Sequence, residues 1–193
     1  MKNLIFRKCN VIILILIIFS GCNQIKLTNE EAQKLIIKEL SLPQKFAKNV
    51  SANWSSDADK LVKEGFMYRK EVGFIVLHYR GYITEKGKPF YLGKNGKDNE
   101  LEDVFNFKTF DADFDAITGI AINKDDQTAT VRFTLKPINV TPIGTLIEEN
   151  INNTRNGELV FKKFDNGWQL AKDQNKGGTE LVKEIWWGKN REN

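Results

Sequence analysis

The feature that most limits what this chain can fold into is a run of nine apolar residues near its start, Val11–Phe19. A membrane-spanning helix needs about 20 apolar residues, so this run is too short to cross a bilayer. Small residues follow it at positions 20 and 21, and three basic residues precede it: Lys2, Arg7 and Lys8. That order is typical of a secretory signal peptide. The sequence therefore predicts that residues 1–21 are removed on export and that the remaining 172 residues build the fold.

A cysteine comes directly after the small residues, giving Phe19-Ser20-Gly21-Cys22. This sequence resembles the lipobox of bacterial lipoproteins, although that pattern usually has Leu, Val or Ile where this chain has Phe19. The resemblance implies that the Cys22 thiol takes a diacylglycerol and that the acyl chains of the mature N-terminus, palmitate among them, hold the protein at a membrane. The alternatives are an ordinary signal peptide, or an uncleaved anchor, with a coincidental cysteine.

Asn23 follows the cysteine. In Gram-negative cells an Asp at that position commonly retains lipoproteins in the inner membrane. The resemblance therefore favours the outer membrane, with the domain facing the periplasm of the envelope. In a Gram-positive cell the same anchor leaves the domain on the outer face of the cell membrane.

Removal of the signal changes both charge and cysteine content. The full chain has 29 basic and 25 acidic residues, and three of the basic residues leave with residues 1–21. The net charge falls from +4 to +1, so no general electrostatic attraction to nucleic acid remains. Cys9 leaves too and Cys22 is lipidated, so no disulfide can form. A chain of this length can rely on its core alone, and we expect a tether at 22–27 and one domain at 28–188.

Helical signals occur near both ends of that domain. Thr28-Asn29-Glu30-Glu31 is a capping-box pattern that begins a helix over about 28–41. A second helix is expected from Ser55 or Ser56 to Gly65, and a short third one over 179–187, stopped by Gly188.

Strand patterns fill the middle. Apolar or alternating runs predict strands at 74–77, 82–84, 90–92 and 128–135, and a hairpin at 159–171 that turns at Asp165-Asn166-Gly167. We therefore expect an α+β fold, with N-terminal helices packed on an antiparallel sheet and a short C-terminal helix. Residues 82–88 look like strand–turn elements of small exported domains. Residues 161–168 are similar to the closing hairpin of NTF2-like and cystatin-like sheets.

Motifs for catalysis are scarce. The sequence has no G-x-S-x-G, no S-x-x-K and no cysteine after Cys22. His78 is the single histidine and follows an apolar run, as a structural strand residue would. Zinc needs three or four ligands, which one histidine without a thiol does not supply. We expect no enzyme activity and no cofactor.

One carboxylate cluster stands out, at Asp111, Asp113 and Asp115. Alternate carboxylates could turn three oxygens toward a calcium ion, but the EF-hand pattern fails at Ala116 and Ile122. The favoured interpretation is a strand whose aspartates face water, with its apolar side packed inward: Phe110, Ala112, Phe114 and Ala116. Lysines such as Lys108 or Lys124 would then offset the repulsion between the aspartates. A calcium-binding domain, or an enzyme that uses these carboxylates, is the alternative.

Aromatic residues are the other candidates. Phe105, Phe107, Phe110 and Phe114 are expected in the core. Trp186 and Trp187 are adjacent on the last expected helix and point about 100° apart, so one narrow stripe does not easily bury both indoles. Trp186 continues the apolar stripe from Val182 and should be the buried indole. Trp187 would then be available to a pocket, a partner or a membrane interface. The alternative is that both indoles are buried. The sequence thus predicts a lipid-anchored envelope protein that binds or assembles without catalysis, with a protein partner in the envelope as one option.

Overall fold

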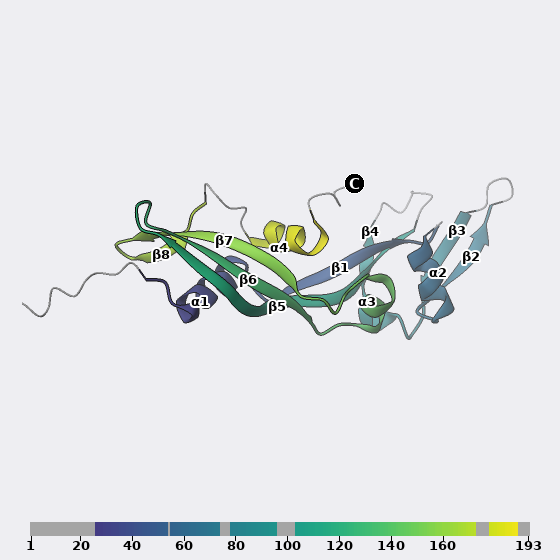
Figure 1. Ribbon diagram of the computed structural model, residues 1–193. Helices are drawn as coiled ribbons and strands as arrows, with labels where there is room; N and C mark the ends of the chain where they lie inside the picture. The colour runs from purple at the N-terminus through teal and green to yellow at the C-terminus, as the bar shows by residue number, and fades with distance from the viewer. Residues whose placement is uncertain (1–25, 54, 74–77, 96–102, 173–177, 189–193) are drawn as a thin grey trace, which may run out of the picture.

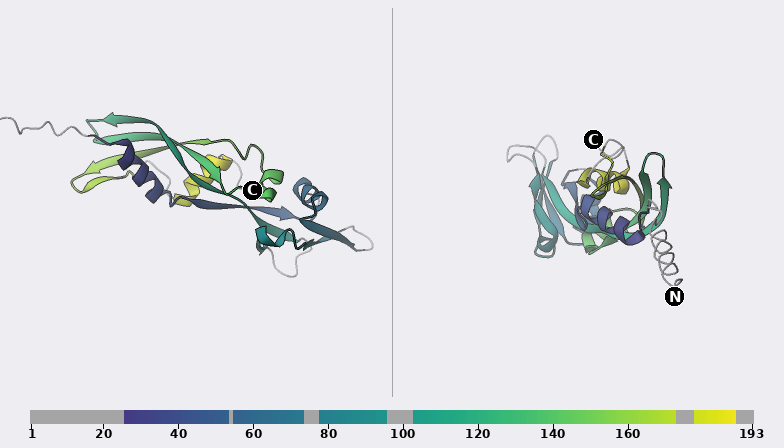
Figure 2. Two further views of the ribbon diagram at one scale, coloured as in Figure 1. Left: turned by 90° about the horizontal axis from the view of Figure 1, so that it is seen from below. Right: turned by 90° about the vertical axis from the view of Figure 1, so that its left-hand side faces the viewer.

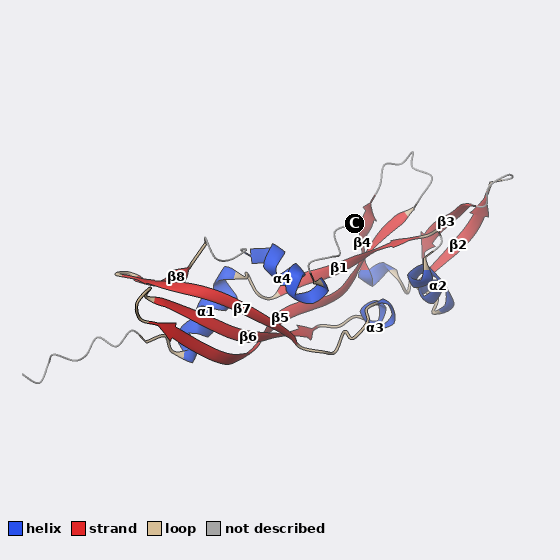
Figure 3. Ribbon diagram, turned by 45° about the horizontal axis from the view of Figure 1, so that its top comes forward, coloured by secondary structure: helices blue, strands red, loops and turns tan. Residues whose placement is uncertain are grey.

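The computed structural model describes residues 26–53, 55–73, 78–95, 103–172 and 178–188 (Figure 1). Strands make up 48% of these residues and helices 26%. Figure 3, coloured by secondary structure, shows strands running along most of the molecule. The expected α+β class, with N-terminal helices packed on a sheet, is therefore wrong, because the fold is dominated by β-strands and the helices are mainly short.

Six of the eight described strands form one curled antiparallel sheet with the path β1–β5–β6–β7–β8, and β4 also pairs with β5. The remaining two, β2 and β3, form a separate hairpin. The strands are β1 (Gln44–Ser51), β2 (Met67–Val72), β3 (His78–Ile83), β4 (Tyr91–Asn95), β5 (Val104–Asn123), β6 (Thr128–Ile138), β7 (Arg155–Phe164) and β8 (Gly167–Leu170). The helices are α1 (Asn29–Glu39), α2 (Ser56–Lys63), the 3-10 helix η1 (Lys88–Phe90), α3 (Pro142–Ile147) and α4 (Gly178–Trp187).

The 20-residue strand β5 organises the whole molecule. Its first part pairs with β1 and β4, and its second part pairs with β6. The register slips at Thr109 against β1 and at Asp115 and Thr118 against β6, so each of these is the extra residue of a bulge. A bulge bends its strand and increases the local twist. These three bulges account for the curl of the sheet.

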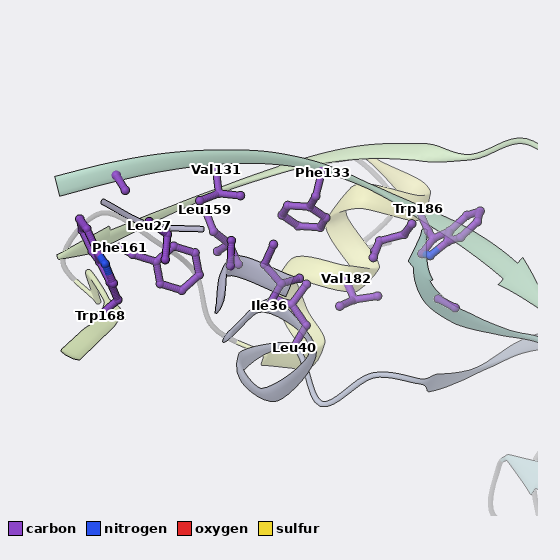
Figure 4. Packing of buried hydrophobic residues seen from close by; sticks show 14 of the residues in the cluster. Leu27, Ile36, Leu40, Val131, Phe133, Leu159, Phe161, Trp168, Val182 and Trp186 are labelled. Atoms are coloured by element: carbon purple, nitrogen blue, oxygen red, sulfur yellow. The ribbon is translucent and has the colours of Figure 1, made fainter. Parts of the chain in front are cut away.

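The hollow of the curled sheet holds α1 and α4 (Figure 2, right). Helix α1 begins as expected, because the Thr28 hydroxyl accepts a 3.2 Å hydrogen bond from the Glu31 N–H and the Glu31 carboxylate accepts a 3.0 Å bond from the Thr28 N–H. Figure 4 shows Ile36 from α1 and Val182 from α4 in one cluster with side chains of β6 and β7. Burial of such side chains stabilises the fold by roughly 1.5–3 kcal/mol each.

A second core cluster lies at the other end of the molecule, where α2, α3 and the start of β5 meet. The β2–β3 hairpin packs there against β5. A Cβ on Gly81 would lie 2.3 Å from the Phe105 ring, so this close approach requires glycine. The expected core role of the phenylalanines is confirmed for Phe105, Phe107 and Phe110, whereas Phe114 is only partly buried.

Two residues expected in the tether, Lys26 and Leu27, pack on the fold. The Trp168 indole N–H, on β8, donates a 3.2 Å hydrogen bond to the Lys26 carbonyl, and Leu27 is only 5% exposed. Residues 26 and 27 therefore belong to the domain. The β2–β3 hairpin lies at the opposite end of the molecule (Figure 1; Figure 2, left).

The other local predictions have separate outcomes. The helices expected at 55–65 and 179–187 and the hairpin at 159–171 are confirmed as α2, α4 and β7–β8. Residues 74–77 lie outside the described residues. None of the helices in the described part of the chain has the length and hydropathy needed to cross a membrane.

Candidate functional site

The aspartate cluster does not form a shared cation site. Asp115 is a bulge residue, so the alternation that would align the three carboxylates is broken. Asp111 Oδ2 instead accepts 2.9 Å hydrogen bonds from Lys108 Nζ and Asn139 Nδ2, and Asp115 pairs with Lys136 Nζ at 3.4 Å. Within the described ranges, no group of three or more His, Cys, Asp or Glu residues could hold a metal ion.

The expected orientation of that segment is only partly correct. Phe110 and Ala112 are buried, but Ala116 is exposed and Asp111 is only 7% exposed rather than facing water. The bulge at Thr109 explains the difference, because it changes the phase of the alternation just before Asp111. Lys108 does offset the Asp111 charge, as expected.

His78 lies far from these groups in the fold. It begins β3, is partly buried, and stands opposite Val72 on the two-stranded hairpin. This position fits the structural role that the sequence indicated.

The two tryptophans of α4 differ in burial, and Trp186 is the more buried one, as predicted. Trp186 is 8% exposed, whereas Trp187 is partly exposed. Trp186 packs edge-on against Phe110, with ring centroids 4.8 Å apart, and Trp187 packs edge-on against Phe46 at 5.0 Å. Both indoles therefore contact the core, and Trp187 keeps part of its surface in water.

A cavity of about 140 Å³ opens beside the two indoles. It lies between α4, β5 and the segment that leads from α3 into β7. Its walls include Phe110, Glu148, Glu149, Arg155, Trp186 and Trp187. A cavity of about 150 Å³ admits a benzene-sized molecule, so this one has room for a single ring-sized group.

Two hydrogen-bond donors in these walls lack acceptors. The indole N–H of Trp186 and the Nε–H of Arg155 are both buried, and neither has a hydrogen-bond partner among the described residues. The Arg155 guanidinium lies 5.6 Å from the centre of the Trp186 ring, so the two side chains pack against each other. A buried donor without an acceptor costs about 1–3 kcal/mol, and a ligand that supplies acceptors would recover that free energy.

Carboxylates on the same walls set the charge of the site. Glu148 and the exposed Glu149 face one arginine, so the walls do not favour a simple anion. Carboxylates accept hydrogen bonds from hydroxyl or amide groups. The cavity thus combines two donors, the exposed Glu149 carboxylate and aromatic walls, which suits an uncharged polar ring.

Arg155 and the two glutamates carry no sequence signal that would mark them as site residues. They lie more than 30 positions before Trp186, in a segment without a motif, and only the packing of α4 against the start of β7 brings them together. An arginine at the first residue of a strand that follows a polar turn is too common to mark a site.

No protein-family model matches this chain, and no curated protein or solved structure matches it significantly. The site must therefore be interpreted from its own geometry.

Proposed function

We propose that this chain is a lipid-anchored protein of the bacterial envelope that acts by binding, without catalysis, and that its ligand occupies the cavity beside Trp186. The lipobox-like sequence before Cys22 supports the anchor. Because Lys26 is already held to Trp168, at most about 14 Å of extended chain separates Cys22 from the fold. Such a domain works close to its membrane.

One observation carries the binding role: two adjacent buried donors, on Trp186 and Arg155, lack acceptors beside a ring-sized cavity. Native structures seldom leave buried donors unpaired, and such groups often have a functional reason. A sugar residue has the required chemistry. Its ring and hydroxyl oxygens accept from the two donors, its hydroxyl groups donate to Glu149, and its apolar face packs on the indoles.

The binding test uses soluble peptidoglycan fragments as the ligand and calorimetry as the measurement. Trp186→Phe keeps an aromatic wall but removes the indole N–H, so affinity should fall about tenfold, the value of one hydrogen bond. Trp168→Phe is the matched control, since that indole N–H already donates to Lys26. Equal affinity of the wild type and Trp186→Phe would contradict the role of this donor, and absence of binding would contradict the ligand class.

The anchor needs a separate test. Cys22→Ser should abolish the incorporation of labelled fatty acid and leave an unlipidated precursor, whereas Cys9→Ser should change neither. Uptake of label by the Cys22→Ser chain would show that Cys22 is not the lipidated residue.

The second candidate function is a calcium-binding or carboxylate-based role at Asp111, Asp113 and Asp115, which the D-x-D-x-D spacing suggested and which the bulge at Asp115 disfavours. Each of these carboxylates has its own partner, and Asp113 accepts from the Phe114 N–H at 2.8 Å. We therefore expect that calcium does not raise the melting temperature. A rise that saturates with calcium concentration would support the metal role, because an ion that binds the native state stabilises it by mass action.

A further inference from the structure

The outer face of the β2–β3 hairpin has an unusual composition. The register places Tyr68 opposite Tyr82 and Lys70 opposite Arg80, at the end of the molecule opposite Lys26. All four side chains are exposed. The other face of the hairpin, with Met67 and Gly81 buried, packs on the second core cluster.

Apolar surface is concentrated on this outer face. Tyr68 is 43% exposed, and Val72 and Tyr82 are each 37% exposed. They are three of the five large hydrophobic side chains that are exposed among the described residues. The two tyrosine rings stack with centroids 4.9 Å apart and planes within 11°. Exposed apolar groups that gather on one face mark an interaction surface.

The charges on the same face are unbalanced. Like charges directly opposite each other in a sheet repel, as Lys70 and Arg80 must. Neither forms an ion pair with any acid in the described parts of the chain. Arg69, on the opposite face, pairs with Asp59. The outer face therefore gains from an anionic partner, which would offset the repulsion between its cations.

We propose that this face docks on the surface of an anionic lipid bilayer. Lys and Arg are attracted to anionic headgroups. Tyrosine is enriched at the membrane interface, where its ring lies at the level of the headgroups. An acidic polymer would neutralise the two cations but would leave Tyr68, Tyr82 and Val72 in water. A bilayer surface matches both the charge and the apolar area.

This docking is independent of the ligand cavity beside Trp186, and the bridging role rests on the proposed lipid anchor. The face lies at the opposite end of the molecule from α1 (Figure 1). A domain attached to one membrane near Lys26 would meet a second lipid surface with this face. The domain would then hold two bilayers together.

The test is vesicle bridging. The full chain is reconstituted in phosphatidylcholine vesicles through its N-terminus, and these are mixed with immobilised vesicles that contain phosphatidylglycerol. Each contact is weak, but many chains on one vesicle act together. The wild type should bridge to the anionic vesicles, not to neutral ones, and bridging should decline in high salt.

Two double variants with equal net charge distinguish binding through this face from a general effect of the protein's charge. Each surface cation contributes about fivefold to partitioning, so K70Q with R80Q should weaken bridging roughly 25-fold. K124Q with K162Q removes two exposed lysines elsewhere and should leave bridging intact. Circular dichroism melting verifies that both double variants are folded.

Three results would overturn the proposal. The first is no bridging by the wild type, and the second is equal loss in the two double variants. The third is capture by beads coated with polyglutamate but not by anionic vesicles, which would assign the face to an acidic polymer. Tyr68→Ser adds a further criterion, because it should reduce bridging to lipid while leaving the charge unchanged.

Discussion

The two tryptophans of α4 should make unequal contributions to stability. Trp186 is 8% exposed and packs on both Phe110 and Phe46, so Trp186→Ala removes a largely buried indole. Deletions of this kind cost about 3–5 kcal/mol, because they combine lost burial with a cavity. Trp187 has its ring contact with Phe46 and keeps part of its surface in water. An aromatic pair contributes about 0.5–1.5 kcal/mol beyond area burial, so Trp187→Ala should cost about 1–2 kcal/mol.

Equilibrium unfolding in urea measures both variants, with the loss of tryptophan fluorescence and of circular dichroism as independent probes. Coincident transitions by the two probes would justify a two-state treatment. The difference between the variants should exceed about 1 kcal/mol, with Trp186→Ala the less stable. Equal losses, or a larger loss for Trp187→Ala, would refute the assignment of Trp186 as the packed indole and of Trp187 as the more exposed one.

Three further changes probe other parts of the fold, each by urea unfolding. Gly167 has a φ of +122° with no atom near an added Cβ, so Gly167→Val should cost about 1–3 kcal/mol through backbone strain alone. A loss of stability under ~0.5 kcal/mol would mean that residue 167 has a backbone conformation open to any residue. Lys108→Gln removes one of the two partners of the buried Asp111 carboxylate and should cost about 1–3 kcal/mol, and an unchanged stability would show that this ion pair contributes nothing. Thr28→Ala should cost about 0.5–2 kcal/mol at neutral pH. Hydrogen bonds from Thr28, first its backbone N–H and then its hydroxyl, lower the pKa of Glu31. Thr28→Ala keeps the backbone N–H and removes only the hydroxyl, so the part of the loss that comes from the hydroxyl–carboxylate bond should disappear as the pH falls below the ordinary glutamate pKa of 4.5. A loss that grows in acid would have the wrong sign.

Local signals in the sequence were sufficient for the elements that depend on neighbouring residues. The Thr28–Glu31 capping box fixes where α1 begins, and both of its hydrogen bonds form. The β7–β8 hairpin follows from alternation and from a glycine at the turn. The order of burial of Trp186 and Trp187 follows from helical spacing after Val182.

The fold class depended on strands that the sequence pattern does not show. Bulges at Thr109, Asp115 and Thr118 interrupt the alternation of β5, so a 20-residue strand resembles several unrelated fragments. Strand β1 lies at the edge of the sheet path, and its buried residues do not alternate regularly with exposed ones. No strand was therefore expected there. Because β1 was missed and only the middle of β5 was expected as a strand, the expected sheet was smaller relative to the helices than the sheet that forms.

Only part of the candidate site could be predicted from the sequence. The indoles come from a recognisable helix, but Arg155 reaches Trp186 through the packing of α4 on β7, which is a contact between segments distant in sequence. Sequence spacing carries no information on such a contact. The unpaired donors are likewise visible only once every neighbouring acceptor has a position.

Binding of a polar ring in the cavity beside Trp186 can be observed in the ¹⁵N-indole spectrum of the chain during titration with soluble peptidoglycan fragments. Four tryptophans give four indole signals, and Trp186→Phe and Trp168→Phe assign the two that matter. We expect the Trp186 N–H signal to shift downfield and saturate as it gains an acceptor, while the Trp168 signal, whose N–H already donates to Lys26, stays in place. A Trp186 signal that does not move at saturating ligand, or one that moves no more than that of Trp168, would contradict binding in this cavity.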